Sequence, residues 1–499
     1  MAIDPESLSI IGVVGAGAMG AGIVQTALTA GLEVVVHDTN KSLLGTAREQ
    51  ILARIARLVE KGQAPKEVLH KAATNLVLAD DLSAFAPAEI VFEAIIEKLE
   101  PKQSLFAALE KIVRPDAVLA TNTSSLSVAA IARGCERRGR VCGLHFFNPV
   151  PLMKLVEVII AADTTDETIA VALALSKRLG KTAVEVKDVP GFLVNLIGRA
   201  YATEALNIEA EGVAPPSVID RIMRDACGFP MGPFELMDLT GIDVNFPVTR
   251  YIYQSFQHDP RLKTTILHEA LYDAGRFGRK TGQGFHVYAD GARLPEPDSA
   301  AQVPMPASLS VYIAEEDPGF APLTEQGLKK ADHTAADVLL IAPKGEDAAT
   351  AALRLKLDPQ RVVAIDFVGA ERKFLTLMAP LGGDGCIDKL AAHLRAKGFA
   401  VATIKDSPGF VAPRILAMIA NLACEVAQMG IGTPEGIDTA MRLAQNYPRG
   451  PLEWATWLGP ARVHETLSHI QAITGSDRYR PSLWLRRRAQ LGLPIHTAP

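Results

Sequence analysis

The chain has 499 residues, 48% of them hydrophobic, and a formal net charge of −5 at pH 7. This length exceeds what one hydrophobic core supports, so we expect three or four domains. The weak negative charge and the lack of a long basic run argue against binding to nucleic acid or to an anionic membrane. No apolar run approaches the roughly 18 residues of a membrane span. Five scattered cysteines without a CxxC pair favour buried thiols in the cytoplasm over disulfides or a metal site.

A dinucleotide-binding motif follows the first expected strand. Residues 8–14 are apolar, Gly15-Ala-Gly-Ala-Met-Gly20 comes next, and a helix-like segment continues to Ala30. Gly15 permits a tight turn, Gly17 lets backbone approach a pyrophosphate, and Gly20 lets the helix pack on the strand. The helix N-terminus adds partial positive charge for phosphates. A glycine-rich turn in an unrelated α/β protein is the alternative.

Asp38 ends the second expected strand, residues 33–37. A carboxylate at this place accepts hydrogen bonds from the adenosine ribose and repels a 2′-phosphate. We therefore expect the cofactor to be NAD in preference to NADP.

A long helix is predicted over residues 41–61, and Arg54, Arg57 and Lys61 share one of its faces. Such cations usually meet only solvent. Contact with a phosphate-rich substrate is the alternative, and the spacing alone leaves both open.

The next expected strands, residues 89–96 and 117–121, flank a helix at 101–113 and continue a doubly wound pattern. The second strand runs into Asn122-Thr-Ser-Ser-Leu126. Ligands bind beyond the carboxyl ends of parallel strands, so Ser124 is a candidate substrate contact. Serines here also cap helices, and Ser125 is a candidate for that role.

The segment Gly143–Val158 places His145 and Glu157 on two apolar strands joined by a proline-rich turn. Two such strands can bring the imidazole and the carboxylate together. A carboxylate on one ring nitrogen fixes the tautomer and basicity of the other, as a general base requires. A core histidine beside an unrelated surface glutamate is the alternative.

After residue 187 the pattern changes to helices. Asn195 falls in the first turns of a helix expected at 192–211, where its amide either faces the nucleotide domain or satisfies local backbone. A glycine-rich loop, Gly278–Phe285, contains Lys280 and closes this half. Residues 289–309, rich in proline, alanine and serine, are expected to be a linker.

The second half repeats the first. Asp188-Val-Pro-Gly-Phe recurs as Asp406-Ser-Pro-Gly-Phe410, and identical residues continue at a constant offset of 218 residues as far as Gly459. An ungapped register of this length indicates a duplicated helical domain.

The chemistry is not repeated. Asp366 stands at the position of His145, Pro413 stands at that of Asn195, and there is no second GxGxxG. We therefore expect the second half to keep the scaffold alone. The cluster Arg486–Arg488 is expected to be a solvated helix face.

These patterns predict four domains and a linker. They are an α/β Rossmann-type NAD domain (1–187), an all-α domain (188–288), the linker (289–309), a reduced Rossmann-like domain (310–405) and a second all-α domain (406–499).

Several motifs together resemble the L-3-hydroxyacyl-CoA dehydrogenase family. The resemblance is dense over residues 8–288, and its most specific part is His145-Phe-Phe-Asn-Pro149. The length of the chain, with Gly228–Pro233 and Asp243–Phe246, resembles the long bacterial members that act on 3-hydroxyadipyl-CoA in phenylacetate breakdown. The other matching motifs are Gly15–Gly20, Asn122–Ser125, Lys154–Glu157, Pro190–Asn195 and Lys280–Phe285.

The resemblance implies NAD-dependent oxidation of an L-3-hydroxyacyl-CoA to a 3-oxoacyl-CoA. His145 would take the proton of the 3-hydroxyl, and Glu157 would orient the imidazole. Ser124 and Asn195 would bind substrate oxygens. It also implies that Asp38, Glu93, Lys98, Asn148 and Lys280 line the NAD site with the three glycines, and that Arg54 and Lys61 join Ser124 in binding coenzyme A.

Alternatives remain for the substrate and for the class of protein. Within the family, 3-hydroxybutyryl-CoA or general fatty-acid β-oxidation substrates are possible. A 6-phosphogluconate-type dehydrogenase would need a lysine at the start of the helical domain, where this chain has Asn195. A non-catalytic nucleotide-binding protein would suit the second half taken alone.

Family enzymes dimerise through the helical domain. Because this chain carries two copies of that domain, we expect an internal pseudo-dimer in which residues 406–490 cover the surface that a second subunit would cover. Further homo-oligomers stay open.

Overall fold

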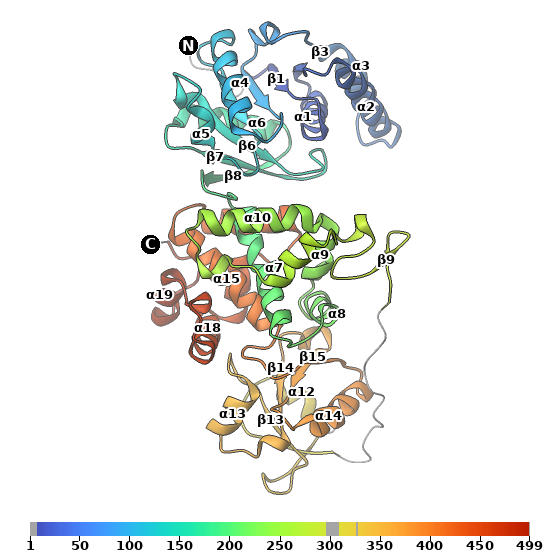
Figure 1. Cartoon of the computed structure of the whole chain (residues 1–499), viewed down its shortest axis with the longest axis vertical. Helices are drawn as coiled ribbons and strands as arrows, with labels where there is room; N and C mark the ends of the chain where they lie inside the picture. Colours follow the sequence, from blue (N-terminus) through green and yellow to red (C-terminus); the bar gives the residue numbers. More distant parts are fainter. Residues whose placement is uncertain (1–6, 296–308, 326–327, 499) are drawn as a thin grey trace. The chain divides into compact units, whose positions relative to one another are not determined.

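The computed structural model describes residues 7–295, 309–325 and 328–498. They fall into two compact units (Figure 1). The first unit holds the chain up to Asn195 together with Met429–Gln445. The second holds Leu196–Gln428 and the chain from Asn446 onward.

An eight-stranded sheet forms the centre of the first unit, in the order β3-β2-β1-β4-β5-β6-β7-β8. Every neighbouring pair is parallel except β6 and β7, which are antiparallel. This is the predicted doubly wound nucleotide-binding architecture. The strands are β1 (Ile10–Val14), β2 (Glu33–His37), β3 (Leu76–Leu78), β4 (Ile90–Glu93), β5 (Val118–Thr121), β6 (Val141–Phe146), β7 (Leu155–Ile160) and β8 (Thr182–Lys187).

Helices cover this sheet because their apolar faces join the strands in one buried core. The helix after β5 is capped by Ser127, whose hydroxyl accepts from Ala130 N–H, and not by Ser125. The helices are α1 (Ala18–Thr29), α2 (Lys41–Glu60), α3 (Lys66–Asn75), α4 (Leu99–Ile112), α5 (Val128–Ala132) and α6 (Asp166–Arg178).

The helical domain is present twice, as predicted. At the start of α9 the Glu235 side chain accepts from Gly232 N–H at 3.0 Å, and at the start of α17 the Glu453 side chain accepts from Gly450 N–H at 2.7 Å. The first copy contains α7 (Val194–Ala210), α8 (Pro216–Arg221), a π-helical turn (Ile222–Ala226), α9 (Pro233–Thr240), α10 (Ile242–Ser255) and α11 (Ile266–Asp273). The second contains α15 (Ala412–Gln428), α16 (Pro434–Gln445), α17 (Pro451–Leu458), α18 (Pro460–Thr474) and α19 (Leu483–Leu491).

A second, smaller sheet lies in the second unit, in the order β12-β11-β13-β14-β15-β16. Its pair β14–β15 is antiparallel, as β6–β7 is in the first sheet. Figure 1 shows α13 (Ala348–Arg354) and α14 (Asp384–Ala396) on either side of its strands. The strands are β11 (Ser310–Ile313), β12 (Lys329–Lys330), β13 (Val338–Ile341), β14 (Val362–Asp366), β15 (Phe374–Met378) and β16 (Ala400–Thr403), and a short helix α12 spans Phe320–Glu325.

The linker expected at residues 289–309 falls largely on residues 296–308, which lie outside the described residues. Its first residues differ from the expectation, because β9 (Tyr288–Ala289) and β10 (Ala292–Arg293) pair as a short antiparallel ribbon.

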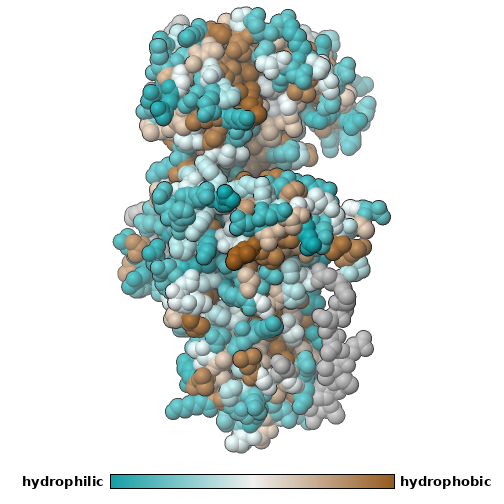
Figure 2. Space-filling view, in the orientation of Figure 1, coloured by the Kyte–Doolittle hydropathy of each residue, from teal (hydrophilic) through white to brown (hydrophobic). Residues whose placement is uncertain are grey.

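None of the described helices combines the length and the apolar character that crossing a membrane requires. On the face that Figure 2 shows, hydrophobic residues form patches separated by hydrophilic ones.

Candidate active site in the first unit

His145 and Glu157 are direct partners across the antiparallel pair β6–β7. Nδ1 of His145 lies 2.6 Å from Oε2 of Glu157, and both side chains are buried. The turn between the strands therefore brings the imidazole and the carboxylate together, as the sequence predicted. A carboxylate only accepts hydrogen bonds, so Nδ1 carries the proton and Nε2 is left as the acceptor.

The second carboxylate oxygen of Glu157 holds the start of α7. Oε1 accepts hydrogen bonds from the backbone N–H groups of Leu193 and Val194, at 3.0 and 2.9 Å. Glu157 is thus fixed from two sides, and its orientation fixes the ring of His145.

A cavity of about 350 Å³ opens in front of His145. It collects one imidazole, one hydroxyl and three side-chain amides. Such a concave site with a few converging polar groups is typical of a substrate or cofactor pocket. The polar residues that line it are Glu97, Lys102, Asn122, Ser124, His145, Asn148 and Asn195.

Glu97 holds the loop that carries Ser124. Its Oε1 accepts hydrogen bonds from Ser124 N–H at 3.0 Å, from Ser125 N–H at 3.2 Å and from the Thr123 hydroxyl at 2.5 Å. Burial works against ionisation of Glu97, but Lys102 at 3.1 Å and these hydrogen bonds lower its pKa. The exposed hydroxyl of Ser124 is consequently presented at the cavity by a charged, fixed loop.

Glu93 and Lys98, which the sequence analysis assigned to the cofactor, do not line this cavity. Glu93 is fully buried and accepts hydrogen bonds from Lys102 at 2.5 Å and from Thr121 at 2.6 Å. Lys98 is the exposed N-cap of α4. Glu97 and Lys102 lie at the cavity instead, and neither was predicted from the sequence.

The glycines of the first loop fit a dinucleotide. Gly15 has φ +106°, and a Cβ there would lie 2.4 Å from the carbonyl oxygen of Ala94. A Cβ on Gly20 would lie 1.8 Å from the carbonyl oxygen of Gly15. A Cβ on Gly17 would meet nothing within 4 Å. Only Gly17 borders open space, at the N-terminus of α1, where a pyrophosphate is favoured.

Asp38 is held beside this loop. Its two oxygens accept hydrogen bonds from Ala16 N–H and Asn40 N–H, each at 2.8 Å. The carboxylate therefore lies next to the phosphate-binding turn, where ribose hydroxyls reach in this fold.

A second cavity, of about 340 Å³, shares Asn148 with the first. Arg54 and Arg57 of α2 line it, whereas Lys61 does not. Gln25 lines it too, and the buried Oε1 of Gln25 has no hydrogen-bond partner in the described part of the chain. This cavity offers two cations and an open acceptor to a ligand.

Lys280 belongs to the second unit. There it forms an ion pair with Asp243 at the start of α10.

The corresponding place in the second half has no room for a substrate. Asp366 pairs across β14–β15 with Thr376, in the positions of His145 and Glu157. The cavity beside Asp366 holds only about 10 Å³, and burial raises the pKa of this carboxyl to about 6. The predicted loss of catalytic residues is therefore accompanied by closure of the site.

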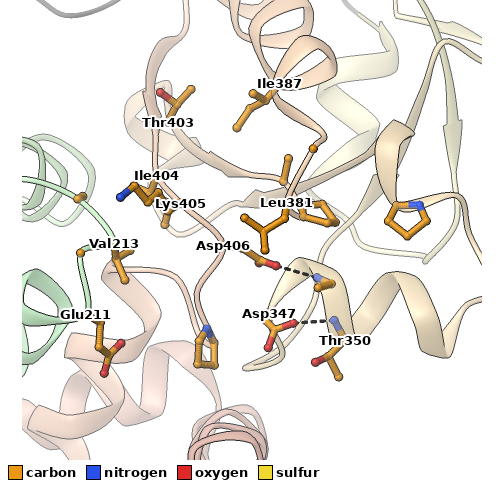
Figure 3. Close-up of a pocket in the computed structure, with 18 of the residues that line it drawn as sticks. Glu211, Val213, Asp347, Thr350, Leu381, Ile387, Thr403, Ile404, Lys405 and Asp406 are labelled. Carbon is orange, nitrogen blue, oxygen red and sulfur yellow. Dashed lines mark hydrogen bonds between the residues drawn. The ribbon is translucent and has the colours of Figure 1, made fainter.

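A cavity of about 1180 Å³ also lies in the second unit (Figure 3). Asp406 accepts from Ala348 N–H and Asp347 from Thr350 N–H, so both carboxylates hold the start of α13. None of the residues that line this cavity is a histidine or a cysteine. In addition, the described residues contain no cluster of three potential metal ligands.

Comparison with known protein families identifies the class of protein that this fold and site define. Residues 10–189 match the NAD binding domain of 3-hydroxyacyl-CoA dehydrogenase. Residues 191–288 and, again, 409–495 match its C-terminal domain. The chain belongs to the 3-hydroxyacyl-CoA dehydrogenase family, and it is an NAD-dependent oxidoreductase of coenzyme A thioesters.

Individual relatives match over different lengths. The 3-hydroxyadipyl-CoA dehydrogenase of Escherichia coli K12 is 38% identical over 97% of this chain and 98% of its own length. A probable 3-hydroxybutyryl-CoA dehydrogenase of Deinococcus radiodurans is 40% identical over 56% of this chain and 99% of its own. The crystal structure of a 3-hydroxybutyryl-CoA dehydrogenase from E. coli K12 is 38% identical, covers 97% of this chain and 99% of its own, and superposes with a TM-score of 0.86.

Proposed function

We propose that this chain oxidises L-3-hydroxyadipyl-CoA to 3-oxoadipyl-CoA with NAD, as a step of phenylacetate breakdown in the cytoplasm. The observation that carries the chemistry is the buried contact of 2.6 Å between His145 and Glu157 at the cavity. The E. coli relative that matches along nearly the whole chain supports the adipyl substrate by its name. Because other relatives are named for 3-hydroxybutyryl-CoA, that ester is the second candidate.

In the proposed mechanism, Nε2 of His145 accepts the proton of the substrate 3-hydroxyl. Bound NAD supplies the hydride acceptor. As His145 becomes cationic, the carboxylate of Glu157 stabilises its charge through the Nδ1 hydrogen bond. Because its Oε1 is held by backbone N–H groups at the start of α7, Glu157 keeps this geometry through the reaction.

Substrate oxygens are assigned to Ser124 and Asn195. Both line the cavity with His145, and the hydroxyl of Ser124 is exposed to it. One contact with the 3-hydroxyl and one with the thioester carbonyl would fix the substrate against the imidazole, which is the positioning that hydride transfer needs.

The cofactor is assigned to the Gly15–Gly20 loop, Asp38 and Asn148, and Lys280 remains a prediction of the family resemblance. We add Glu97 and Lys102 to this set, since they line the cavity, and Glu93 and Lys98 stay predictions of the family resemblance. The open space at Gly17 supports the position of the pyrophosphate.

Coenzyme A is assigned to the neighbouring cavity and the face of α2. Arg54 and Arg57 would meet its phosphates, and Lys61 would extend the cationic face toward solvent. The open Oε1 of Gln25 would accept an N–H of the pantetheine arm.

The substrate is tested by NADH formation from a panel of CoA thioesters. We expect kcat/KM for 3-hydroxyadipyl-CoA to exceed that for 3-hydroxybutyryl-CoA by at least about tenfold. Equal values would refute the adipyl assignment and leave the family intact. No turnover of any 3-hydroxyacyl-CoA would refute the proposed site.

We further propose an internal pseudo-dimer, with each helical copy contacting the strand before the other copy. Lys187 N–H donates to the Ile431 carbonyl at 2.9 Å, and Lys405 N–H donates to the Val213 carbonyl at 3.0 Å. Both partners are related by the offset of 218 residues. Such reciprocal contacts are characteristic of a two-fold interface.

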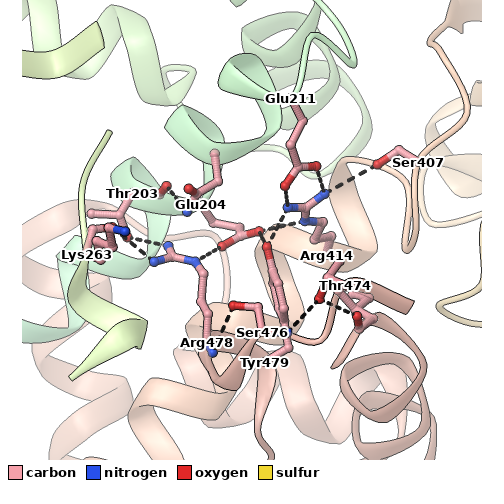
Figure 4. Close-up of polar contacts among 12 residues, drawn as sticks. Thr203, Glu204, Glu211, Lys263, Ser407, Arg414, Thr474, Ser476, Arg478 and Tyr479 are labelled. Carbon is pink, nitrogen blue, oxygen red and sulfur yellow. Dashed lines mark hydrogen bonds and ion pairs between the residues drawn. The ribbon is translucent and has the colours of Figure 1, made fainter. Parts of the chain in front are cut away.

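A buried ionic cluster supports the same proposal within the second unit (Figure 4). Glu204 of α7 binds Arg414 of α15 and Arg478, each at 2.6 Å. Burial opposes the charge of Glu204, but these two guanidinium groups lower its pKa. Reciprocally, Arg261 of the first copy binds Glu425 of α15 at 2.8 Å. The two copies thus share desolvated ion pairs, which neither has alone.

A chain truncated at about residue 290 would expose these charges. We expect it to aggregate or to self-associate in light scattering, whereas the full chain would not need a second subunit. A truncated chain that is soluble and monomeric would refute the pseudo-dimer.

A further inference from the structure

The second helical copy contains a cavity that lies outside the site described above. It holds about 650 Å³ and lies among α15, α18, α19 and the segment that precedes α19; we name it the α18–α19 cavity. All its residues belong to the second unit. They are Glu425, His464, Ser468, Gln471, Arg480, Pro481, Ser482, Leu483, Arg486 and Gln490.

In the first helical copy, the corresponding positions carry mostly larger side chains, and two of these have charges opposite to each other. The position of His464 is held by Phe246, which packs against Tyr272 with ring centroids 5.1 Å apart. The position of Ser468 is held by Arg250. Beyond the matching turns Pro260–Leu262 and Asp477–Tyr479 the offset between the copies is 217, so the position of Arg486 is held by Glu269, which lies 3.9 Å from Arg250.

The cavity thus distinguishes the second copy from the first. Ala489 replaces Tyr272, so the second copy has lost an aromatic ring at this place. It has also exchanged the carboxylate of Glu269 for the guanidinium of Arg486.

The lining carries an excess of positive charge. Its one carboxylate, Glu425, is already bound by Arg261, which also holds Asp259 at 2.7 Å. Arg480 and Arg486 form no ion pair or side-chain hydrogen bond with the described residues. Both arginines are exposed, and within the lining no carboxylate is paired with either; outside the lining, Asp259 interacts electrostatically with Arg480.

Several hydrogen-bond donors line the cavity. The hydroxyl of Ser468 donates to the His464 carbonyl, whereas that of Ser482 accepts from Leu485 N–H and keeps its own proton as a donor. Arg480, Arg486, His464 and the amide of Gln490 remain as well. Burial and the nearby Arg486 lower the pKa of His464, so the imidazole is neutral near pH 7 and a bound anion would favour its protonation.

We propose that the α18–α19 cavity binds a phosphate-bearing small molecule, with the phosphate between Arg480 and Arg486. Two guanidinium groups on separate elements suit the several oxygens and double charge of a phosphate. The cavity volume lies within the range of small-molecule sites and exceeds what a phosphate alone fills, so a phosphate ester fits the space. The second helical copy then has a ligand of its own.

Calorimetric titration of the full chain, with saturating NAD, tests this proposal. Pyrophosphate and adenosine 3′,5′-bisphosphate are the phosphate probes, and adipate is the carboxylate probe. We expect Arg486→Glu and His464→Phe, which restore the charge and the ring of the first copy, to weaken phosphate binding by on the order of tenfold to a hundredfold. Arg487→Glu, an exposed neighbour on α19, is the matched control and should leave binding unchanged.

Each outcome decides the proposal. Tighter binding of the nucleotide than of pyrophosphate identifies a phosphate ester, and the reverse identifies inorganic phosphate; either supports a phosphate site. Binding that Arg486→Glu leaves unchanged, binding of adipate in preference to both phosphates, or no binding heat at all would overturn it.

Discussion

Glu157 contacts His145 through only one of its two carboxylate oxygens. The other oxygen is held by two backbone N–H groups, so an amide at this position would turn its oxygen toward them and its NH₂ toward Nδ1. Nδ1 would then accept, Nε2 would carry the proton, and the ring would no longer act as a base. We therefore expect Glu157→Gln to lower kcat by about a hundredfold or more.

NADH formation measures this effect, and Glu185→Gln, an exposed glutamate on neighbouring β8, is its control. A kcat for Glu157→Gln within about twofold of the unchanged chain would mean that the pair does not set the tautomer.

Gly17 and Gly20 of the first loop should respond differently to substitution by alanine. Gly20→Ala places a Cβ against the Gly15 carbonyl, so both thermal stability and NAD affinity should fall. Gly17→Ala meets no protein atom within 4 Å, so it should fold normally and weaken NAD binding by about tenfold. Calorimetry and fluorescence titration separate the two effects. Normal NAD affinity in Gly17→Ala would place the pyrophosphate elsewhere.

The carboxylate of Asp38 should decide between NAD and NADP. Asp38→Asn keeps an acceptor for Ala16 N–H and removes the charge that repels a 2′-phosphate. We expect the ratio of kcat/KM for NADP to that for NAD to rise by about tenfold. Asp80→Asn, which removes an exposed carboxylate paired with Lys41, should leave the ratio unchanged. An unchanged ratio in Asp38→Asn would contradict the ribose assignment.

Asp366 should make the stability of the second sheet depend on pH. Burial raises its pKa from 3.8 to about 6, so the folded state binds this proton more tightly than the unfolded state. Its stabilising contribution is fully present below about pH 4 and is lost as pH rises through about 6. Asp366→Asn should therefore raise the free energy of opening at the β14 amides by up to about 3 kcal/mol at pH 8 and have little effect near pH 4. Slower hydrogen exchange of these amides at pH 8 would report this gain. Equal effects at both pH values would contradict this.

The sequence predicted those features that local pattern determines. His145 and Glu157 were found because a short turn forces two strands to pair, and the Gly15–Gly20 loop because strand, turn and helix follow in order. The repeat was found because its register has no gaps.

Contacts that depend on where a helix begins could not be predicted. The family resemblance pointed to Glu93 and Lys98, but the Glu93 side chain is fully buried at the end of β4 and Lys98 is exposed at the N-cap of α4. Lys102, one turn further along α4, folds back to Glu97 at the cavity. Lys102 follows Lys98 by four residues, which places the two on the same face of the helix. This spacing could have indicated Lys102 as a candidate.

The same limit applies to Arg486–Arg488. Arg486 and Arg487 are exposed, as the expected solvated face requires, whereas Arg488 is buried against Trp484. Arg488 is distinguished by its nearby partners, the ring and carbonyl of Trp484 and the carbonyl of Thr497.

We propose that one catalytic histidine, His145, serves a chain that carries its scaffold twice. NADH formation by His145→Gln tests it most directly, with His70→Gln on the surface of α3 as the control. We predict that His145→Gln lowers kcat by about 10²- to 10⁴-fold and leaves the NAD dissociation constant unchanged. A variant that keeps most of its activity would show that another group, in either half, takes the proton.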